Sequence, residues 1–193
     1  FRSVRIVSGK YAGRDLVSPR DSRVRPTAEH VRAATLDLVA DDVVGARVLD
    51  LFAGTGAVGI EAVSRGASHV TFVDLDPRAV ALVERNLARC GVAAGYTILR
   101  SSAASAVATL GERGESTFDL AWLDPPYTSA DDARLDREVV QAVEGIGRML
   151  APDGWLVHEH ARRRPTPEAA GRLVKFRVIE AGSSALSFYA VRP

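Results

Sequence analysis

The sequence has only one cysteine, Cys90, among its 193 residues. A single thiol excludes an internal disulfide and a metal site built from cysteines, and it is typical of a reducing compartment. No apolar run approaches the ~20 residues that a membrane-spanning helix needs, and the first residues show no signal-peptide pattern. We therefore expect a cytoplasmic protein without membrane association. The chain begins with Phe1 rather than Met, and the sequence leaves open whether native residues precede it.

Lysine is also scarce, with only Lys10 and Lys175, so arginine carries most of the positive charge. The net charge is +1 but is spread unevenly. Residues 1–26 hold seven basic and two acidic residues, and the remainder holds 18 basic and 22 acidic residues. A basic segment on a slightly acidic body favours docking to a polyanion such as a nucleic acid. The alternative is a solvated, arginine-rich face with no ligand.

The start of the chain predicts a small hairpin followed by a helix. Residues 4–18 alternate apolar and polar side chains around a turn, as a β-hairpin does. Residues 25–41 predict a helix with Thr27 as its N-cap and with Val31, Ala34 and Leu38 on one apolar face.

From Arg47 onward, strands alternate with helices. This order predicts an α/β fold with a parallel sheet covered on both faces, to which a closing hairpin adds an antiparallel edge. The segment at 162–168, "RRRPTPE", is the most loop-like. We expect strands at 47–53, 69–76, 96–101, 118–124 and 154–160, and the hairpin over 173–192.

A glycine-rich turn, Gly54-x-Gly56-x-x-Gly59, follows the first of these strands directly. Glycines let the backbone turn sharply and approach a ligand, which then faces the N-terminus of the next helix. Asp74 ends the next strand 20 residues after Gly54, where a carboxylate can accept hydrogen bonds from both ribose hydroxyls. The pattern predicts a cofactor that carries a ribose; the alternative is a tight packing turn without a ligand.

The nature of that cofactor depends on Asp50, four residues before the first glycine. The same glycine pattern is found in NAD-binding domains. A carboxylate at Asp50 would repel a pyrophosphate, however, and it suits the cationic amino group of an amino acid. S-adenosylmethionine has an amino-acid tail, a sulfonium and a ribose, so it fits Asp50 and Asp74 better than a dinucleotide does.

The fourth strand ends in "DLAWLDPPY", with Asp124, Pro125, Pro126 and Tyr127 at its end. In a doubly wound sheet this strand lies beside the first, at the carboxyl edge where ligands bind. Asp124 and the carbonyl of Pro125 can accept the two N–H groups of an exocyclic base amine and favour a nucleophilic, pyramidal nitrogen. Tyr127 offers a ring on which an extruded base stacks, worth ~1–3 kcal/mol. The residues predict methyl transfer to that nitrogen through positioning, with no metal.

Two segments carry a family resemblance: "LDLFAGTGAVGIEAVSRGA" at 49–67 and "DLAWLDPPY" at 119–127. They resemble the cofactor and catalytic motifs of class I S-adenosylmethionine-dependent N-methyltransferases. The opening "RIVSGKYAGRDLVSP" and "RPTAEHVRAATLDLV" is similar to that of the RsmD-type 16S rRNA guanine-N2 methyltransferases. The resemblance covers nearly the whole chain.

This resemblance implies a seven-stranded Rossmann-like domain at 27–193, preceded by a basic hairpin extension at 1–26 that docks RNA. It implies methylation of the N2 of one guanine in 16S rRNA (guanine 966 in the family type) during small-subunit assembly, and we expect a monomer without a metal. The catalytic motif falls on Asp124, Pro125, Pro126 and Tyr127. The cofactor residues would be Asp50, Phe52, Gly54, Thr55, Gly56, Gly59, Asp74, Leu75 and Ser102, and the RNA-binding residues Arg5, Lys10, Arg14, Arg23 and Arg25.

One position departs from the family pattern. Many relatives place an acid after the third strand to meet the adenine amine, and here Ser101 and Ser102 stand in its place. A serine can still accept that hydrogen bond. We expect structural roles for His30, His158 and His160, because His158 and His160 share one strand face and no third metal ligand is evident.

Three other functions stay open at this point. A DNA adenine or cytosine amino-methyltransferase shares the Asp-Pro-Pro-Tyr motif, but this chain has no room for a separate recognition domain. An NAD-dependent oxidoreductase shares the glycine turn. A catalytically silent RNA-binding assembly factor would use the basic segment alone.

Overall fold

The structure is a computed structural model that describes residues 4–19, 26–38, 40–112, 117–126, 133–164 and 166–192. Two antiparallel strands, β1 (Val4–Arg5) and β2 (Asp15–Leu16), form the expected N-terminal hairpin. The helices are α1 (Pro26–Leu38), α2 (Ala40–Val43), α3 (Ala57–Ser64), α4 (Pro77–Cys90), α5 (Ala103–Glu112) and α6 (Ala133–Met149).

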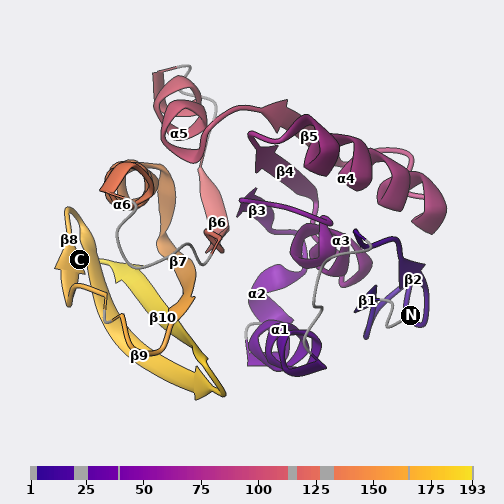
Figure 1. Cartoon of the computed structure of the whole chain (residues 1–193), viewed down its shortest axis with the longest axis horizontal. Helices are drawn as coiled ribbons and strands as arrows, with labels where there is room; N and C mark the ends of the chain where they lie inside the picture. The colour runs from indigo at the N-terminus through magenta and orange to yellow at the C-terminus, as the bar shows by residue number, and fades with distance from the viewer. Residues whose placement is uncertain are drawn as a thin grey trace.

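A mixed sheet forms the centre of the described chain (Figure 1). Its strand order is β5-β4-β3-β6-β7-β10-β9-β8. The first five of these strands run parallel, and β10, β9 and β8 add antiparallel pairs. The strands are β3 (Arg47–Leu51), β4 (His69–Asp74), β5 (Tyr96–Arg100), β6 (Phe118–Leu123), β7 (Leu150–Ala161), β8 (Ala169–Ala170), β9 (Leu173–Ala181) and β10 (Ser184–Val191).

This arrangement confirms the α/β Rossmann-like fold, with one correction to the strand count. In the part of the chain that the structure describes, the sheet holds eight strands rather than seven, because Ala169–Ala170 pairs with Leu173 and Val174 of β9. A two-residue strand is too short to show an alternation of apolar and polar residues, so the sequence pattern gave no sign of it.

Helices cover both faces of the sheet. One hydrophobic core joins residues of α1, α2, α3 and α4 to one face, and a second joins α5 and α6 to the other. Strand alternation divides neighbouring residues between them: Trp122 and Val157 belong to the first core, whereas Leu123 and Leu156 belong to the second. We call the side of the sheet that carries the first core the α1–α4 face and the side that carries the second core the α5/α6 face.

The buried face of α1 differs from the predicted one. The helix begins at Pro26, so Thr27 lies within it and is not its N-cap; the side chains of Thr27 and His30 lie outside the described part. Leu38 is 46% exposed and Ala34 is exposed, whereas Arg32 and Leu36 are buried. A search for apolar residues at helical spacing does not find the buried face of α1, because that face includes the buried Arg32.

The N-terminal extension is bound to α3 by one buried carboxylate. Glu61 accepts hydrogen bonds from the backbone N–H groups of Val7 (2.8 Å) and Ser8 (2.9 Å) and pairs with Arg65 at 3.1 Å. The buried Arg32 guanidinium lies 4.0 Å from Glu61 and donates to the carbonyl of Arg5. The extension and the main domain therefore pack as one unit in the described residues.

Close packing reinforces this contact. Gly9 has a φ of +84°, and a Cβ added to it would lie 1.9 Å from the carbonyl oxygen of Ser64. The Ser64 hydroxyl accepts from Tyr11 N–H and donates to the Ser8 carbonyl. Only glycine fits at position 9, because the turn of the extension lies directly on the last turn of α3.

Removal of the Glu61 carboxylate should destabilise the fold far more than removal of the other acid paired with Arg65. We expect Glu61→Ala to lower the free energy of unfolding by roughly 3 kcal/mol or more, because it leaves buried arginine and N–H groups without their acceptor. Asp37, whose side chain is 64% exposed, is the matched control, and Asp37→Ala should cost under about 1 kcal/mol. Urea unfolding measures both free energies, and equal losses in the two variants would contradict the role of Glu61 in binding the extension to α3.

Candidate active site

Three aspartates gather where parallel strands end at the carboxyl edge of the sheet. β3 pairs with β4 on one side and with β6 on the other, with Asp50 opposite both Phe72 and Trp122. Asp74 is the last residue of β4, and Asp124 follows β6 with its N–H still bonded to the Leu51 carbonyl. The predicted cofactor and amine residues are thus brought together by strand register.

The turn after β3 is built from left-handed backbone conformations. Phe52 has a φ of +59°, and Gly54 and Gly56 have φ values of +56° and +75°. A non-glycine residue at positive φ is uncommon and such strain concentrates at functional sites. Among the described residues, a Cβ at Gly54 would meet only the Phe52 carbonyl oxygen, at 3.9 Å, which leaves space beside Gly54 that a ligand can approach.

Gly59 serves packing and hydrogen bonding. A Cβ at Gly59 would lie 2.2 Å from the ring of Phe72, so the lack of a side chain lets α3 lie directly against β4. Its N–H donates to Asp50 Oδ2 at 3.0 Å. Gly59 therefore acts on the site indirectly, through its hydrogen bond to Asp50.

Burial dominates the electrostatics of Asp50, which is 2% exposed. Burial raises its pKa from the ordinary 3.8 to about 7. The Gly59 N–H lowers this pKa, the nearby Asp74 charge raises it, and Arg32 lowers it. A buried carboxylate favours a cationic neighbour, since a nearby positive charge stabilises the ionised form that burial destabilises.

Asp74 holds the turn and keeps acceptor capacity. Its Oδ2 accepts from the Gly54 N–H and its Oδ1 from the Asp76 N–H, each at 2.9 Å. An ionised carboxylate has about four acceptor positions, so each oxygen can accept one more hydrogen bond, as two ribose hydroxyls require. The next residue, Leu75, is 54% exposed and can cover an adenine ring.

Asn86 is a supporting residue that the sequence analysis missed. This fully buried side chain on α4 donates to the carbonyls of Val17 (3.0 Å) and Thr55 (2.8 Å) and accepts from the Val17 N–H (2.7 Å). It ties the N-terminal extension to the glycine turn. An asparagine inside an amphipathic helix is a weak sequence signal, because such residues are usually solvated.

Asp124 lies close to two other acidic side chains, Glu159 and Asp50. Its side chain keeps exposed surface, yet protein surrounds it closely enough that desolvation raises its pKa well above 3.8, with Glu159 and then Asp50 adding to the increase. Glu159 lies beside it because Leu123 pairs with His158 in the parallel β6–β7 register. Solvent contact screens part of this effect, and the upward direction rests on both the surroundings and the two neighbouring acids. Tyr127 lies outside the described residues.

The predicted RNA-binding residues differ in how they are engaged. Arg5 forms an ion pair with Asp15 at 3.2 Å, and Arg14 donates to the Cys90 carbonyl and lies over the Tyr11 ring. Lys10 is exposed, with its Nζ 5.4 Å from the centre of that ring. Arg23 and Arg25 lie outside the described part of the chain.

Ser102 has a local role in the structure. Its hydroxyl accepts from the Ser105 N–H at 3.2 Å and contacts the Ser105 hydroxyl at 2.9 Å, which is the geometry of an N-cap for α5. Its predicted contact with adenine stays a prediction. Among the described residues no group of three His, Cys, Asp or Glu side chains is placed to hold a metal ion, and no described helix is long and apolar enough to cross a bilayer.

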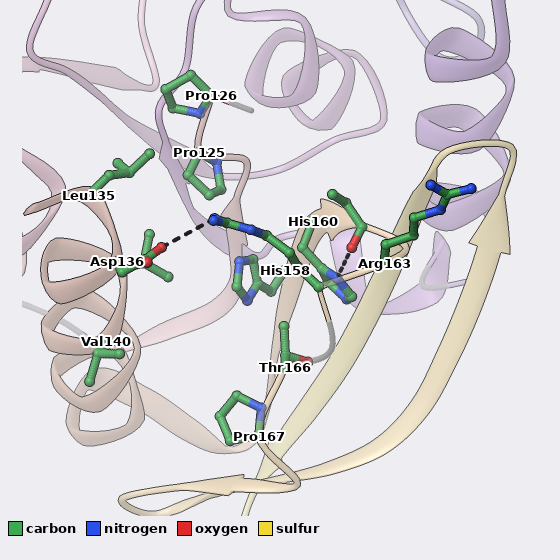
Figure 2. Close-up of a pocket in the computed structure, with 13 residues that line it drawn as sticks. Pro125, Pro126, Leu135, Asp136, Val140, His158, His160, Arg163, Thr166 and Pro167 are labelled. Atoms are coloured by element: carbon green, nitrogen blue, oxygen red, sulfur yellow. Dashed lines mark hydrogen bonds and ion pairs between the residues drawn. The ribbon is translucent and has the colours of Figure 1, made fainter. Parts of the chain in front are cut away.

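A cavity of about 590 Å³ opens next to the Asp-Pro-Pro segment (Figure 2). Pro125 and Pro126 line it together with residues of α6, β7 and the segment that follows β7. His158 and His160 both line it, with ring centres 5.4 Å apart, which confirms that they share one strand face.

These features fit S-adenosylmethionine. Asp74 retains acceptors for a ribose, Gly54 leaves space for close approach, and Asp50 and Asp124 create a negative environment at the end of β3 and β6 that suits a sulfonium and an ammonium group. A pyrophosphate would meet two carboxylates there, so the donor set disfavours a dinucleotide.

Comparisons with known proteins agree with this geometry. The family described as conserved hypothetical protein 95 matches residues 4–190. YlbH of Bacillus subtilis, whose name assigns it provisionally as an rRNA methyltransferase, is 34% identical over 189 residues, which cover 98% of this chain and 100% of YlbH. Ribosomal RNA small subunit methyltransferase D of Escherichia coli K12 is 31% identical over 156 residues, covering 81% of this chain and 71% of that protein.

Solved structures share the fold over most of the chain. A hypothetical protein of Thermus thermophilus matches with a TM-score of 0.76 and 30% identity, over 98% of this chain and 99% of that one. The 16S rRNA N2 G1207 methyltransferase of Thermus thermophilus, solved with AdoMet and guanosine, matches with a TM-score of 0.74 and 20% identity, over 100% of this chain and 50% of that one.

Cofactor binding should depend on pH through Asp50. Because a cation favours the ionised carboxylate, binding of S-adenosylmethionine below pH 7 must release a proton from Asp50. We expect affinity to rise with pH up to about 7, by at most about tenfold per unit, and then to level off. Isothermal titration calorimetry in buffers of different ionisation enthalpy measures the released proton, and Asp50→Asn should abolish the release and weaken binding.

Asp50 should also make the stability of the folded protein fall as pH rises, whereas it makes cofactor affinity rise. The folded-state pKa of Asp50 is raised above its unfolded value, so the folded protein binds an extra proton between about pH 4 and 7. Its contribution to stability is therefore present at the low end of this window and is lost as pH rises toward 7. Asp50→Asn should remove this decline in urea unfolding, and an unchanged pH profile would show that Asp50 titrates normally.

Proposed function

The chain belongs to the family described as conserved hypothetical protein 95, and on that premise we propose that it methylates the exocyclic N2 of a guanine in 16S rRNA. It is an S-adenosylmethionine-dependent rRNA methyltransferase; the names of its relatives assign rRNA methylation to small subunit methyltransferase D and, provisionally, to YlbH. The observation that carries the proposal is the placement of Asp124 beside Asp50 at the shared end of β6 and β3. The guanine N2, as the target atom, is our inference.

The proposed cofactor residues divide between the two halves of S-adenosylmethionine. When bound, this cofactor supplies a methyl group activated on a sulfonium. Asp50 would hold the methionine half electrostatically, and Phe52, Gly54, Thr55, Gly56 and Gly59 form or support the turn around it. Asp74 would bind the ribose, and Leu75 and Ser102 would contact the adenine.

Asp124 would orient the acceptor and take its proton. Its carboxylate accepts one N–H of the guanine N2, and the Pro125 carbonyl accepts the other, so the nitrogen lone pair points toward the methyl. As the nitrogen gains the methyl it must lose one proton, and Asp124 Oδ is the acceptor within hydrogen-bond reach. Its raised pKa makes the ionised carboxylate a stronger proton acceptor than an ordinary aspartate. Pro126 fixes the segment, and Tyr127 would stack on the base.

The basic extension at 1–26 would dock rRNA phosphates next to the methyltransferase domain at 27–193. Arg5, Lys10, Arg14, Arg23 and Arg25 are the proposed contacts. Asn86 and Glu61 support this arrangement, because they join the extension to the glycine turn and to α3. We further propose a monomer that acts in the cytoplasm on an assembling small subunit.

The direct experiment is transfer of a tritiated methyl group to small-subunit rRNA that lacks the modification, followed by nucleoside analysis. We expect the label in N2-methylguanosine. Label in N6-methyladenosine or in a ring-carbon product would reject the base and atom proposed here, and transfer to DNA alone would favour the DNA amino-methyltransferase.

Loss of the Asp124 carboxylate should abolish the reaction without abolishing cofactor binding. We expect Asp124→Ala to lower the methyl-transfer rate by roughly 10²–10⁴-fold, since it removes both an orienting acceptor and a proton acceptor. Asp119 is the second residue of the same strand, at the end away from the site, and it accepts from the Arg47 N–H, so Asp119→Ala is the matched control with near-normal rate. Retained activity in Asp124→Ala would exclude this mechanism and favour a silent assembly factor.

Lys10 should contribute to the salt dependence of rRNA binding. We expect Lys10→Gln to reduce the log–log slope of affinity against salt by about 0.7–0.9, as loss of one phosphate contact does. Arg177, an exposed residue of β9 in the antiparallel part of the sheet, is the control, and Arg177→Gln should leave the slope unchanged. Filter binding over a salt series measures both, and equal changes would argue against docking through the extension.

A further inference from the structure

The cavity beside Pro125 and Pro126 lies on the α5/α6 face of the sheet. β7 residues line it through His158 and His160, and α6 lines it through Leu135, Val139 and Val140 (Figure 2). The segment after β7 closes another side, held by the Arg164–Asp136 ion pair at 3.5 Å and by the bond from Thr166 to the Ser187 hydroxyl. The cavity is therefore framed by ordered contacts.

Strand alternation places the target amine on the other face. Trp122 belongs to the core on the α1–α4 face, so Asp124, two residues later, points to that side. Leu123 and Leu156 belong to the α5/α6 core, which places His158 on that side, opposite Leu123 in the register. A base gripped by Asp124 and the cavity over His158 therefore occupy two different spaces, with Pro125 and Pro126 between them.

His158 is a buried polar group that no described residue satisfies. It is 7% exposed, lines the cavity, and makes no hydrogen bond in the described part of the chain. The neighbouring His160, in contrast, has Nδ1 at 3.1 Å from the Ala161 carbonyl and Nε2 at 2.9 Å from the Ser187 hydroxyl. The ring nitrogens of His158 are not among the fully enclosed unpaired atoms of the described residues, so they open onto the cavity and can bond to a ligand there.

The charge state of His158 defines what it can recognise. Burial and then the adjacent His160 lower its pKa from 6.5 to about 3. The other titratable or charged groups that line the cavity are His160 on β7, Asp136 on α6, and Arg163 and Arg164 after β7, and Arg163 points away from His158 (Figure 2). The imidazole is therefore neutral at physiological pH and offers one donor and one acceptor, as the edge of a nucleobase does.

We propose that this cavity binds the base of a nucleotide immediately flanking the target guanosine, and that His158 hydrogen-bonds the edge of that base. The walls of Pro125, Leu135, Val140 and Pro167 are apolar and suit a flat ring. Pro126 lies two residues from Asp124, within about 7 Å along the chain, so adjacent nucleotides can reach both spaces. The inference rests on the proposed function and adds a sequence-context preference to it.

A double-mutant cycle between protein and RNA tests the contact. The protein variants are His158→Leu, which removes both ring nitrogens at similar volume, and His158→Gln, which keeps a donor and an acceptor. The RNA variants carry an abasic nucleotide on the 5′ or the 3′ side of the target guanosine. His69→Leu is the control, since His69 lies at the start of β4 and contacts Thr97. Thermal unfolding and S-adenosylmethionine binding verify that each variant is folded.

We expect His158→Leu to raise KM for intact rRNA about fivefold to tenfold, the effect of one lost hydrogen bond, and to leave kcat little changed. We expect the KM of His158→Gln to lie between that of His158→Leu and that of the unaltered protein. On RNA that is abasic at one flanking position, His158→Leu and the unaltered protein should have equal KM. Additive effects at both flanking positions, or a loss confined to kcat, would overturn the proposal. Methylation of intact rRNA by the unaltered protein tests the proposed function separately, so its failure is distinguishable from failure of the cavity assignment.

Discussion

The constraint on which the site depends is the parallel pairing of β3 with β6, because it holds the carboxylates of Asp50 and Asp124 near one another at the edge of the sheet. Burial raises the pKa of both residues, Asp74 adds to the increase at Asp50, and Glu159 and then Asp50 add to the increase at Asp124. A cation between them lowers both pKa values. The fold thus maintains a negative environment that suits a sulfonium and an ammonium group, and the same field brings the acceptor amine close to a carboxylate that can take its proton.

The glycine turn is kept in its strained shape by residues outside the cofactor motif. Asp74 binds the Gly54 N–H, Asp50 binds the Gly59 N–H, and Asn86 binds the Thr55 carbonyl. Asn86 also binds both polar groups of Val17 in the N-terminal extension. The surface proposed to dock RNA and the turn proposed to bind the cofactor therefore share one buried side chain, which gives RNA docking a physical connection to cofactor geometry.

Sequence reasoning succeeded where a local pattern has a direct structural meaning. Alternating strands and helices, and the spacing from Gly54 to Asp74, were enough to predict the sheet and the residues at its carboxyl edge. It failed where a tertiary contact decides the outcome: Arg32 is buried because Glu61 lies beside it, and Ala169–Ala170 is a strand only because β9 passes next to it. The roles of Glu61, Asn86 and His158 depend on which side chains surround them, and no spacing in the chain encodes those neighbours.

A crystal structure of the protein with S-adenosylhomocysteine and guanosine would test the central claim most directly. The account predicts that the guanosine N2 lies within hydrogen-bonding distance of both Asp124 Oδ and the Pro125 carbonyl oxygen, with the cofactor sulfur on the opposite side of that nitrogen and its ammonium group against Asp50. An Asp124 side chain turned away from the sulfur, or a guanosine bound elsewhere with no amine at Asp124, would contradict it.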